Sequence, residues 1–229
     1  MLSGPFGHPQ GPSGYAVVDL EATGSSSRRH RVLELAVVLL DRNLEPQGEF
    51  STLVDPQGPV GPTHIHGIEA GHLGGAPQFA GVAGRLLNLL RGRVLVGHNV
   101  GCDRAFLAAE YARIGLRLPV VPELCTMRMA ADRGGDAPRP YGLSLIACAA
   151  SVGITDWNPH TALGDARTTA ALFTHYAPGV PGLADHLARA AAVGWPEASG
   201  LLAAADALWM GRGNEPALRS VPNVRHGGA

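Results

Sequence analysis

Three short apolar runs follow one another near the start of the chain, and turn residues separate them. They cover Tyr15–Leu20, Arg31–Leu40 and Phe50–Val54. Runs of this length that are rich in Val and Leu predict β-strands, and strands that follow one another along the chain usually pair. A fourth run, Arg93–Gly97, lies between two segments with helical spacing of apolar residues. The sequence therefore predicts an antiparallel meander followed by alternating strands and helices.

Residues 55–80, after the meander, hold four Pro and six Gly, which predicts a mostly irregular segment. A short strand is predicted at Leu118–Val121. The predicted helices cover Gly81–Leu90, Cys102–Ile114, Cys125–Ala131, Leu143–Val152 and Thr161–Tyr176. This order predicts an α/β fold with a mixed five-stranded sheet flanked by helices.

Composition divides the chain into three parts. Residues 1–14 are rich in Gly, Pro and Ser and predict a disordered leader. Residues 15–177 contain the predicted sheet, and residues 178–229 form an Ala- and Leu-rich extension with a polar tail. Two helices are predicted in this extension, Ala184–Val193 and Glu197–Met210, and the second has one apolar stripe. That stripe either packs on the domain or binds a second copy or a partner protein.

Charge and cysteine usage exclude several classes of protein. The chain has 18 basic and 19 acidic residues, so its overall field does not drive nucleic-acid binding. All the basic residues are Arg, which excludes a Schiff-base lysine and a phosphate-loop lysine. The three cysteines form no CxxC pair, so neither a zinc ribbon nor a disulfide framework is predicted. No apolar run is long enough for a membrane span and no signal peptide is visible, so a cytoplasmic location is expected.

Asp19 and Glu21 are the first candidates for chemistry. They are two residues apart at the end of a predicted buried strand, so both carboxylates project from one face. Two neighbouring acids repel each other unless a positive charge lies between them, and the nearest basic residue is Arg28. A divalent cation would provide that charge. The alternative is a strand that emerges into solvent with two exposed acids.

Two further segments carry polar residues beside apolar ones. Asp103 follows the Arg93–Gly97 strand, where an acid is also favoured by the dipole of the next helix. His160 and Asp165 are five residues apart at the start of a predicted helix, and Asp165 lies among apolar residues. The alternative for this pair is a capping motif that begins the helix.

In combination, these motifs resemble the DEDDh family of 3′→5′ exonucleases, which includes the epsilon proofreading subunit of bacterial DNA polymerase III. The likeness runs from about Tyr15 to Tyr176. It consists of three motifs in order, Asp-x-Glu-x-Thr-Gly, His-Asn-x-x-x-Asp and His-x-x-x-x-Asp. His66-Gly67-Ile68 and Tyr141-Gly142-Leu143-Ser144-Leu145 are softer features of the same family.

The resemblance implies a ribonuclease-H-like fold that binds two divalent metal ions, Mg²⁺ or Mn²⁺. By position, the four metal-binding and catalytic carboxylates would be Asp19, Glu21, Asp103 and Asp165, and His160 would be the general base. The residues expected to hold the 3′-terminal nucleotide are Leu20, Thr23, Gly24, Ile65, His66, His98 and Asn99. The implied partner is the 3′ end of a single-stranded nucleic acid.

The chain departs from the family pattern at two positions. Cys102 replaces the Phe that is common before the third acid, and Cys125-Thr126 replaces a frequent Asp-Thr. Neither change affects a predicted metal ligand, so catalysis is expected while substrate preference stays open. The leading hypothesis is an exonuclease on single-stranded DNA. The alternatives are an exoribonuclease and a non-catalytic module that binds a polymerase.

Overall fold

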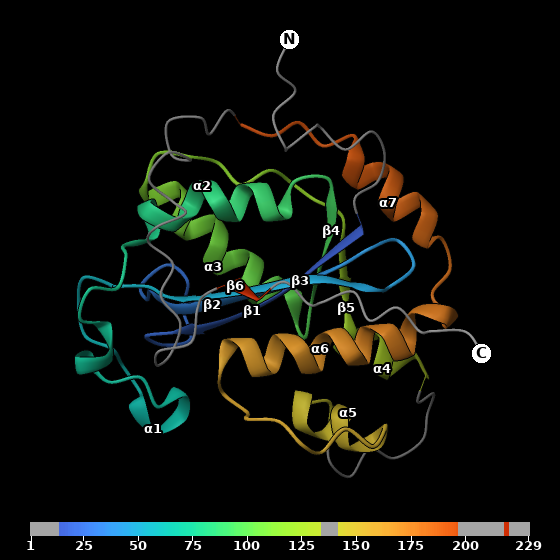
Figure 1. The fold of residues 1–229 in the computed structure, drawn as a ribbon, viewed down its shortest axis with the longest axis horizontal. Coiled ribbons are helices and arrows are strands. Elements are labelled where there is room, and N and C mark those ends of the chain that lie inside the picture. The colour runs from blue at the N-terminus through green and yellow to red at the C-terminus, as the bar shows by residue number, and fades with distance from the viewer. Residues whose placement is uncertain (1–13, 134–141, 197–217, 220–229) are drawn as a thin grey trace.

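The structure is a computed structural model that describes residues 14–133, 142–196 and 218–219 (Figure 1). A single sheet forms its centre, with strand order β5-β4-β1-β2-β3-β6. The strands are β1 (Gly14–Ala22), β2 (Val32–Leu40), β3 (Pro46–Leu53), β4 (Arg93–Gly97), β5 (Glu123–Cys125) and the two-residue β6 (Leu218–Arg219). β1, β2 and β3 pair antiparallel, whereas β4 pairs parallel with both β1 and β5. The predicted mixed five-stranded sheet is confirmed, and β6 is added beside β3.

Helices cover both faces of the sheet. In Figure 1, α2 (Phe79–Leu90) and α3 (Val100–Arg113) lie above it, and α6 (Ala162–Tyr176) lies below it. Also on the lower side are α4 (Thr126–Arg133) and α5 (Leu145–Ser151). The remaining helical segments are α1 (Thr63–His66), η1 (Ala70–Leu73), η2 (Ala177–Gly179) and α7 (Leu183–Ala191).

The two core clusters follow the alternation of side chains along β1. Ala16 and Val18 pack with α2 and α3, whereas Tyr15 and Val17 pack with α6. Every residue of β2 is buried, which explains why its sequence is a nearly continuous apolar run rather than an alternating one. The same alternation places Asp19, two residues after Val17, on the face that α6 covers.

The short strand β5 lies a few residues after the strand predicted at Leu118–Val121. Pro119 lies within that run and Pro122 follows it, and proline has no backbone N–H for a ladder. Leu118 and Val121 are buried in the core instead, and pairing with β4 begins at β5. The sequence pattern identified buried side chains correctly but assigned them to the wrong backbone structure.

Two predicted segments lie outside the described residues. They are nearly all of the leader, residues 1–13, and the second C-terminal helix, Glu197–Met210. α7 corresponds to the first C-terminal helix, and its Leu187 and Ala190 are buried in the cluster that α6 forms with the sheet. We propose a boundary between residues 177 and 178, which separates the domain that contains the sheet from the C-terminal extension. No helix in the described part of the chain is long and apolar enough to cross a membrane.

A buried ion-pair network joins α3 to the connection between β1 and β2. The Glu110 side chain, fully buried, accepts hydrogen bonds from Nε and Nη2 of Arg31 at 2.8 and 3.0 Å. It also accepts the backbone N–H of Val32 at 3.1 Å and lies 3.2 Å from Nη1 of Arg113. Arg113 in turn donates to the carbonyls of Ser27 and His30. Because α3 carries Asp103 and the connection follows Glu21, this network fixes two parts of the candidate site relative to each other.

We expect Glu110→Ala to lower the free energy of unfolding by about 2–4 kcal/mol, because Arg31 and a buried backbone N–H lose their acceptor. Urea denaturation of the two proteins measures this difference. The control is Glu123→Ala, which breaks the exposed Arg104–Glu123 pair and should cost less than about 1 kcal/mol. Equal effects of the two substitutions would contradict a special role for the Glu110 network.

Candidate active site

The end of β1 carries Asp19 and Glu21 on one face, as predicted, and both are half-buried. Burial raises the pKa of Asp19 well above its usual range, and the neighbouring charges of Asp103, Asp165, Glu21 and Glu34 raise it further. These influences indicate that acids from β1, β2, α3 and α6 gather around one point. The alternative of two separate, solvent-exposed acids does not fit this arrangement.

Asp103 lies in the first turn of α3 and is 8% exposed. α3 can begin directly after β4 because Asn99 adopts a left-handed backbone conformation with φ of 66°. Burial raises the pKa of Asp103 to about 8, and Glu21 adds to this effect, while backbone N–H groups of Asp103 itself and Leu20 oppose it. A role confined to the helix dipole would not require this burial beside a second acid.

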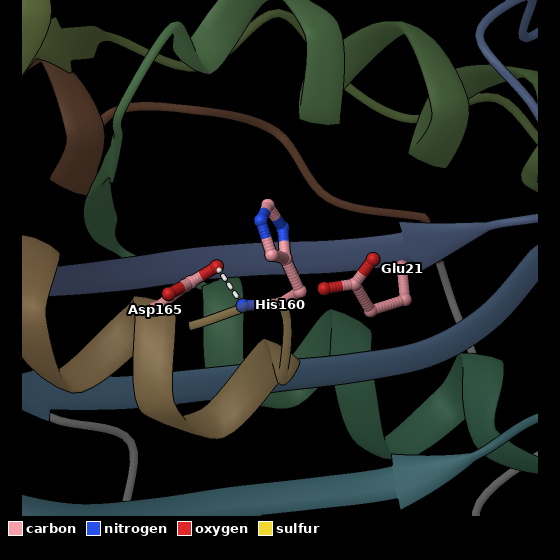
Figure 2. A group of neighbouring side chains, drawn as sticks. All are labelled: Glu21, His160 and Asp165. Atoms are coloured by element: carbon pink, nitrogen blue, oxygen red, sulfur yellow. Dashed lines mark hydrogen bonds between the residues drawn. The ribbon is translucent and has the colours of Figure 1, made fainter. Parts of the chain in front are cut away.

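α6 carries Asp165 in its first turn, and the preceding loop carries His160 (Figure 2). The Asp165 carboxylate accepts the indole N–H of Trp157 at 2.9 Å and the backbone N–H of His160 at 3.1 Å. Burial raises the pKa of Asp165, and these two hydrogen bonds oppose the increase. Thr161 is the N-cap, and its side chain accepts the backbone N–H of Gly164, so the predicted capping motif is present together with the acid cluster.

Glu21, His160 and Asp165 form one compact group. Each offers a ligand atom, and these atoms all lie within 4.8 Å of one another (Figure 2). His160 is exposed, with a left-handed backbone at φ of 59°. Its side chain projects between the two carboxylates in Figure 2. The donors are hard oxygens and an imidazole nitrogen, and hard oxygens suit Mg²⁺ and Mn²⁺.

Thr23 and Gly24 form the tight turn after β1. The Thr23 hydroxyl accepts the backbone N–H of Arg31 at 3.0 Å. A Cβ atom at Gly24 would lie 2.6 Å from the His30 imidazole, so the turn requires glycine at this position. Leu20 lies on the opposite face of β1 from Asp19 and packs against the core formed with α2 and α3. The turn therefore stands beside the acid cluster, where the predicted substrate contacts would be made.

The loop after β3 presents Ile65 and His66 in different ways. Ile65 is 48% exposed, whereas His66 is 2% exposed. Both ring nitrogens of His66 face backbone groups, with Nε2 3.2 Å from the Val60 carbonyl and Nδ1 accepting the Ile68 N–H at 3.0 Å. This geometry makes His66 part of the loop's internal structure, and its contact with a nucleotide stays a prediction.

His98 and Asn99 join β4 to α3. The His98 ring lies between the hydroxyl of Thr126 at 2.9 Å and the carbonyl of Leu143 at 2.8 Å, and burial lowers its pKa. Its two nitrogens thus connect the end of β4 to α4 and to the segment before α5. Sequence reasoning identified His98 only by its place in the motif, because its partners lie far away in the chain.

The basic cluster at residues 28–31 has two parts. Arg31 is bound by Glu110 and so stabilises the fold, while Arg28 and Arg29 are exposed.

Of the two cysteines that depart from the family pattern, Cys102 is exposed and Cys125 is half-buried.

We expect the metal-free protein to lose stability as the pH rises through the titration of Asp103. Its pKa is raised from 3.8 to about 8, so the folded protein binds this proton more tightly than the unfolded chain does. The stabilising contribution is therefore complete below about 3.8 and is lost as the pH rises through about 8. Melting temperatures in EDTA, compared between the wild type and Asp103→Asn, isolate this contribution. A wild-type curve that rises relative to the variant across this range would contradict the acid cluster.

Comparison with known proteins places the chain in a family. Residues 16–173 match RNase_T, a family described as Exonuclease. The chain is 32% identical over 162 residues to the DNA polymerase III subunit epsilon of Aquifex aeolicus, covering 69% of this chain and 78% of that protein. It is 34% identical over 172 residues to a DNA polymerase III subunit epsilon-like protein of Rhodobacter capsulatus, covering 72% of this chain and 24% of that one. It spans a quarter or less of the length of the first curated relatives that it matches.

The fold also occurs in solved structures. Exonuclease I of E. coli, in complex with a dT13 oligonucleotide, superposes with a TM-score of 0.65 at 19% identity. The superposition covers 75% of this chain and 42% of that one. The matched segment contains all four carboxylates and His160. The chain therefore belongs to the RNase_T exonuclease family, whose members are hydrolytic enzymes.

Proposed function

We propose that this protein removes nucleoside 5′-monophosphates one at a time from the 3′ end of single-stranded DNA. The observation that carries the proposal is the convergence of Glu21, His160 and Asp165 within 4.8 Å, beside Asp19 and Asp103. A non-catalytic module would have no need to keep four mutually repelling carboxylates, because their burial opposes folding when no cation is bound.

The carboxylates Asp19, Glu21, Asp103 and Asp165 would hold two divalent cations. When bound, the cations neutralise the acid cluster, lower the pKa of a coordinated water and stabilise charge on the phosphate and the leaving 3′-oxygen. The raised pKa values of Asp19 and Asp103 support this assignment, because they arise from burial and from the other acids of the same cluster. Mg²⁺ and Mn²⁺ both suit this set of oxygens.

His160 would be the general base of the reaction. It is exposed next to Glu21 and Asp165, so its imidazole can take a proton from an attacking water and pass it to solvent. The hydrogen bond from its backbone N–H to Asp165 fixes the loop at 3.1 Å from that carboxylate.

The 3′-terminal nucleotide would bind between the turn at Thr23–Gly24, the exposed Ile65 and the start of α3 at Asn99. A few unpaired nucleotides held by stacking and by the cations do not require a strongly basic protein. This agrees with 18 basic residues against 19 acidic ones. The names of the relatives from Aquifex and Rhodobacter support association with a polymerase, which we include in the proposal.

The proposal also specifies the sugar of the substrate, which is deoxyribose and not ribose. Solved structures with this fold hold dT13 in one case and rAMP in another, so the fold accommodates both sugars. The test uses matched DNA and RNA oligomers labelled at the 3′ or 5′ end, with Mg²⁺, Mn²⁺ or EDTA. We expect stepwise loss from the 3′ end, faster on DNA and absent in EDTA. Faster hydrolysis of RNA would favour an exoribonuclease, and no hydrolysis in either metal would reject the proposed function.

A further inference from the structure

Glu34 is a fifth carboxylate at the site, outside the predicted metal set. It is 3% exposed on β2 and lies opposite Glu21 in the register of β1 and β2. Its Oε2 accepts a hydrogen bond from the backbone N–H of Ala162 at 2.8 Å. We propose that Glu34 is a positioning residue that holds the start of α6, and with it His160 and Asp165, against the carboxylates of β1.

The contact is made at the first residue of α6. The first backbone N–H groups of a helix have no partner within the helix. Here the Thr161 hydroxyl satisfies one of them by accepting from Gly164. Regular helical bonding begins with the N–H of Asp165, which donates to the Thr161 carbonyl. Ala162 is fully buried, so water cannot replace the Glu34 oxygen as its acceptor. A carboxylate is also the favoured partner at a helix N-terminus, since the helix dipole is positive there.

The site is divided among several elements. Asp19 and Glu21 belong to β1, Asp103 belongs to α3, and a second pair consists of Asp165 in the first turn of α6 and His160 in the loop before it. The hydrogen bond between His160 and Asp165 keeps the second pair together but does not fix its distance from the first pair. Glu34 spans the two pairs, because the strand that carries it is hydrogen-bonded to β1 and its side chain is bonded to α6.

A matched control exists on the same helix. Arg167, farther along α6, donates to the carboxylate of Glu49 on β3, so this pair also ties α6 to the sheet. The Arg167 side chain is 49% exposed, and the pair lies outside the group formed by Glu21, His160 and Asp165. Glu49→Ala therefore removes a tie between α6 and the sheet without removing the one at the site.

The test compares four substitutions in the full chain, and it rests on the proposed function for its kinetic part. Glu34→Gln keeps an acceptor oxygen at the same reach but loses the charge, whereas Glu34→Asp keeps the charge but is one methylene shorter. Glu34→Ala loses both, and Glu49→Ala is the control. We measure kcat and KM on a 3′-labelled DNA oligomer, Mn²⁺ affinity by calorimetry, and the hydrogen exchange of the Ala162 amide.

We expect Glu34→Ala and Glu34→Asp to lower kcat or Mn²⁺ affinity by about 10–100-fold, the usual effect of residues that orient metal ligands. KM for the oligomer should change by less than about threefold, and the Ala162 amide should exchange at least about tenfold faster, because it loses its acceptor. Glu34→Gln and Glu49→Ala should stay within about threefold of the wild type in every measurement. Rescue by Gln and not by Asp is an outcome that a general loss of stability would not produce.

Two results would overturn the inference. Wild-type kcat and Mn²⁺ affinity in Glu34→Ala would remove any positioning role. Wild-type behaviour of Glu34→Asp together with loss in Glu34→Gln would mean that Glu34 acts by its charge and not by its reach. If the wild type hydrolyses no oligomer, the proposed function fails separately, and Mn²⁺ affinity and amide exchange still decide on Glu34.

Discussion

Replacing Asp19 with asparagine should reduce nuclease activity by at least about 10³-fold. Cations at such a site contribute several kcal/mol of transition-state stabilisation, and each 1.4 kcal/mol corresponds to about a factor of ten in rate. Asp19 has a raised pKa because it is buried and because four other acids act on it, so it lies at the centre of the cluster. Its loss should therefore weaken the binding of both cations.

The same substitution should leave the stability of the metal-free protein unchanged or higher, because it removes one charge from a group of mutually repelling carboxylates. Hydrolysis of a 3′-labelled oligomer measures the first effect, and urea denaturation in EDTA measures the second. Glu45→Gln, in the exposed turn between β2 and β3, is the control and should change neither. Near-wild-type turnover of Asp19→Asn in Mg²⁺ would show that the site is assigned wrongly.

Asp165 differs from Asp19 in the effect that its replacement should have on the stability of the protein. Its carboxylate accepts hydrogen bonds from the Trp157 indole and from the His160 backbone, so its removal leaves two donors without their acceptor. Asp165→Ala should abolish activity too, but with a measurable loss of stability. The contrast between the two aspartates follows from the structure and not from the motif, in which both are metal-ligand positions.

His160→Ala should slow hydrolysis by about 10²–10⁴-fold, which is the usual contribution of a general base. Mn²⁺ binding should persist, because the carboxylates remain. Rates of hydrolysis of a 3′-labelled oligomer, with Mn²⁺ affinity by calorimetry, make the measurement.

His175→Ala is the matched control for His160→Ala. His175 lies in the last turn of α6, the helix that follows His160, and is exposed, and its ring packs edge-on against Tyr176 with centroids 5.3 Å apart. It should keep the wild-type rate. An unchanged rate in His160→Ala would remove the role of base from this residue and leave the metal site intact.

The sequence predicted that Asp19 and Glu21 share a face because strand periodicity is a local property. Asp19 and Glu21 share a face by the two-residue repeat of a strand, and the structure has them on one face of β1. Their proximity to Asp103 and Asp165 depends on the order of strands in the sheet. No local pattern specifies that order, and the grouping of the four acids was implied by the family resemblance.

The residues that sequence reasoning missed are those whose partners are backbone groups or lie far along the chain. Glu34 stands inside an apolar run, and its partner is the backbone N–H of Ala162, which leaves no mark in the sequence. Trp157 lies in an irregular loop, and its indole N–H donates a hydrogen bond to Asp165. Glu110 lies on a helix where an acid is common, and only its burial next to Arg31 distinguishes it. The sequence offered one signal for these residues, which is an acid inside an otherwise apolar run, and that acid is Glu34.

The division of the site between β1 and α6 has a consequence for how the protein acquires its activity during folding. β1 stands near the beginning of the matched segment and α6 near its end, yet α6 packs directly against β1 and β2. Contacts between segments so distant in sequence close a long loop of chain and form slowly. During synthesis, nearly the whole domain would have to be made before Asp165 of α6 could contact the carboxylates of β1. High-affinity Mn²⁺ binding should accordingly be among the last properties to appear in refolding, and its time course would report when α6 docks.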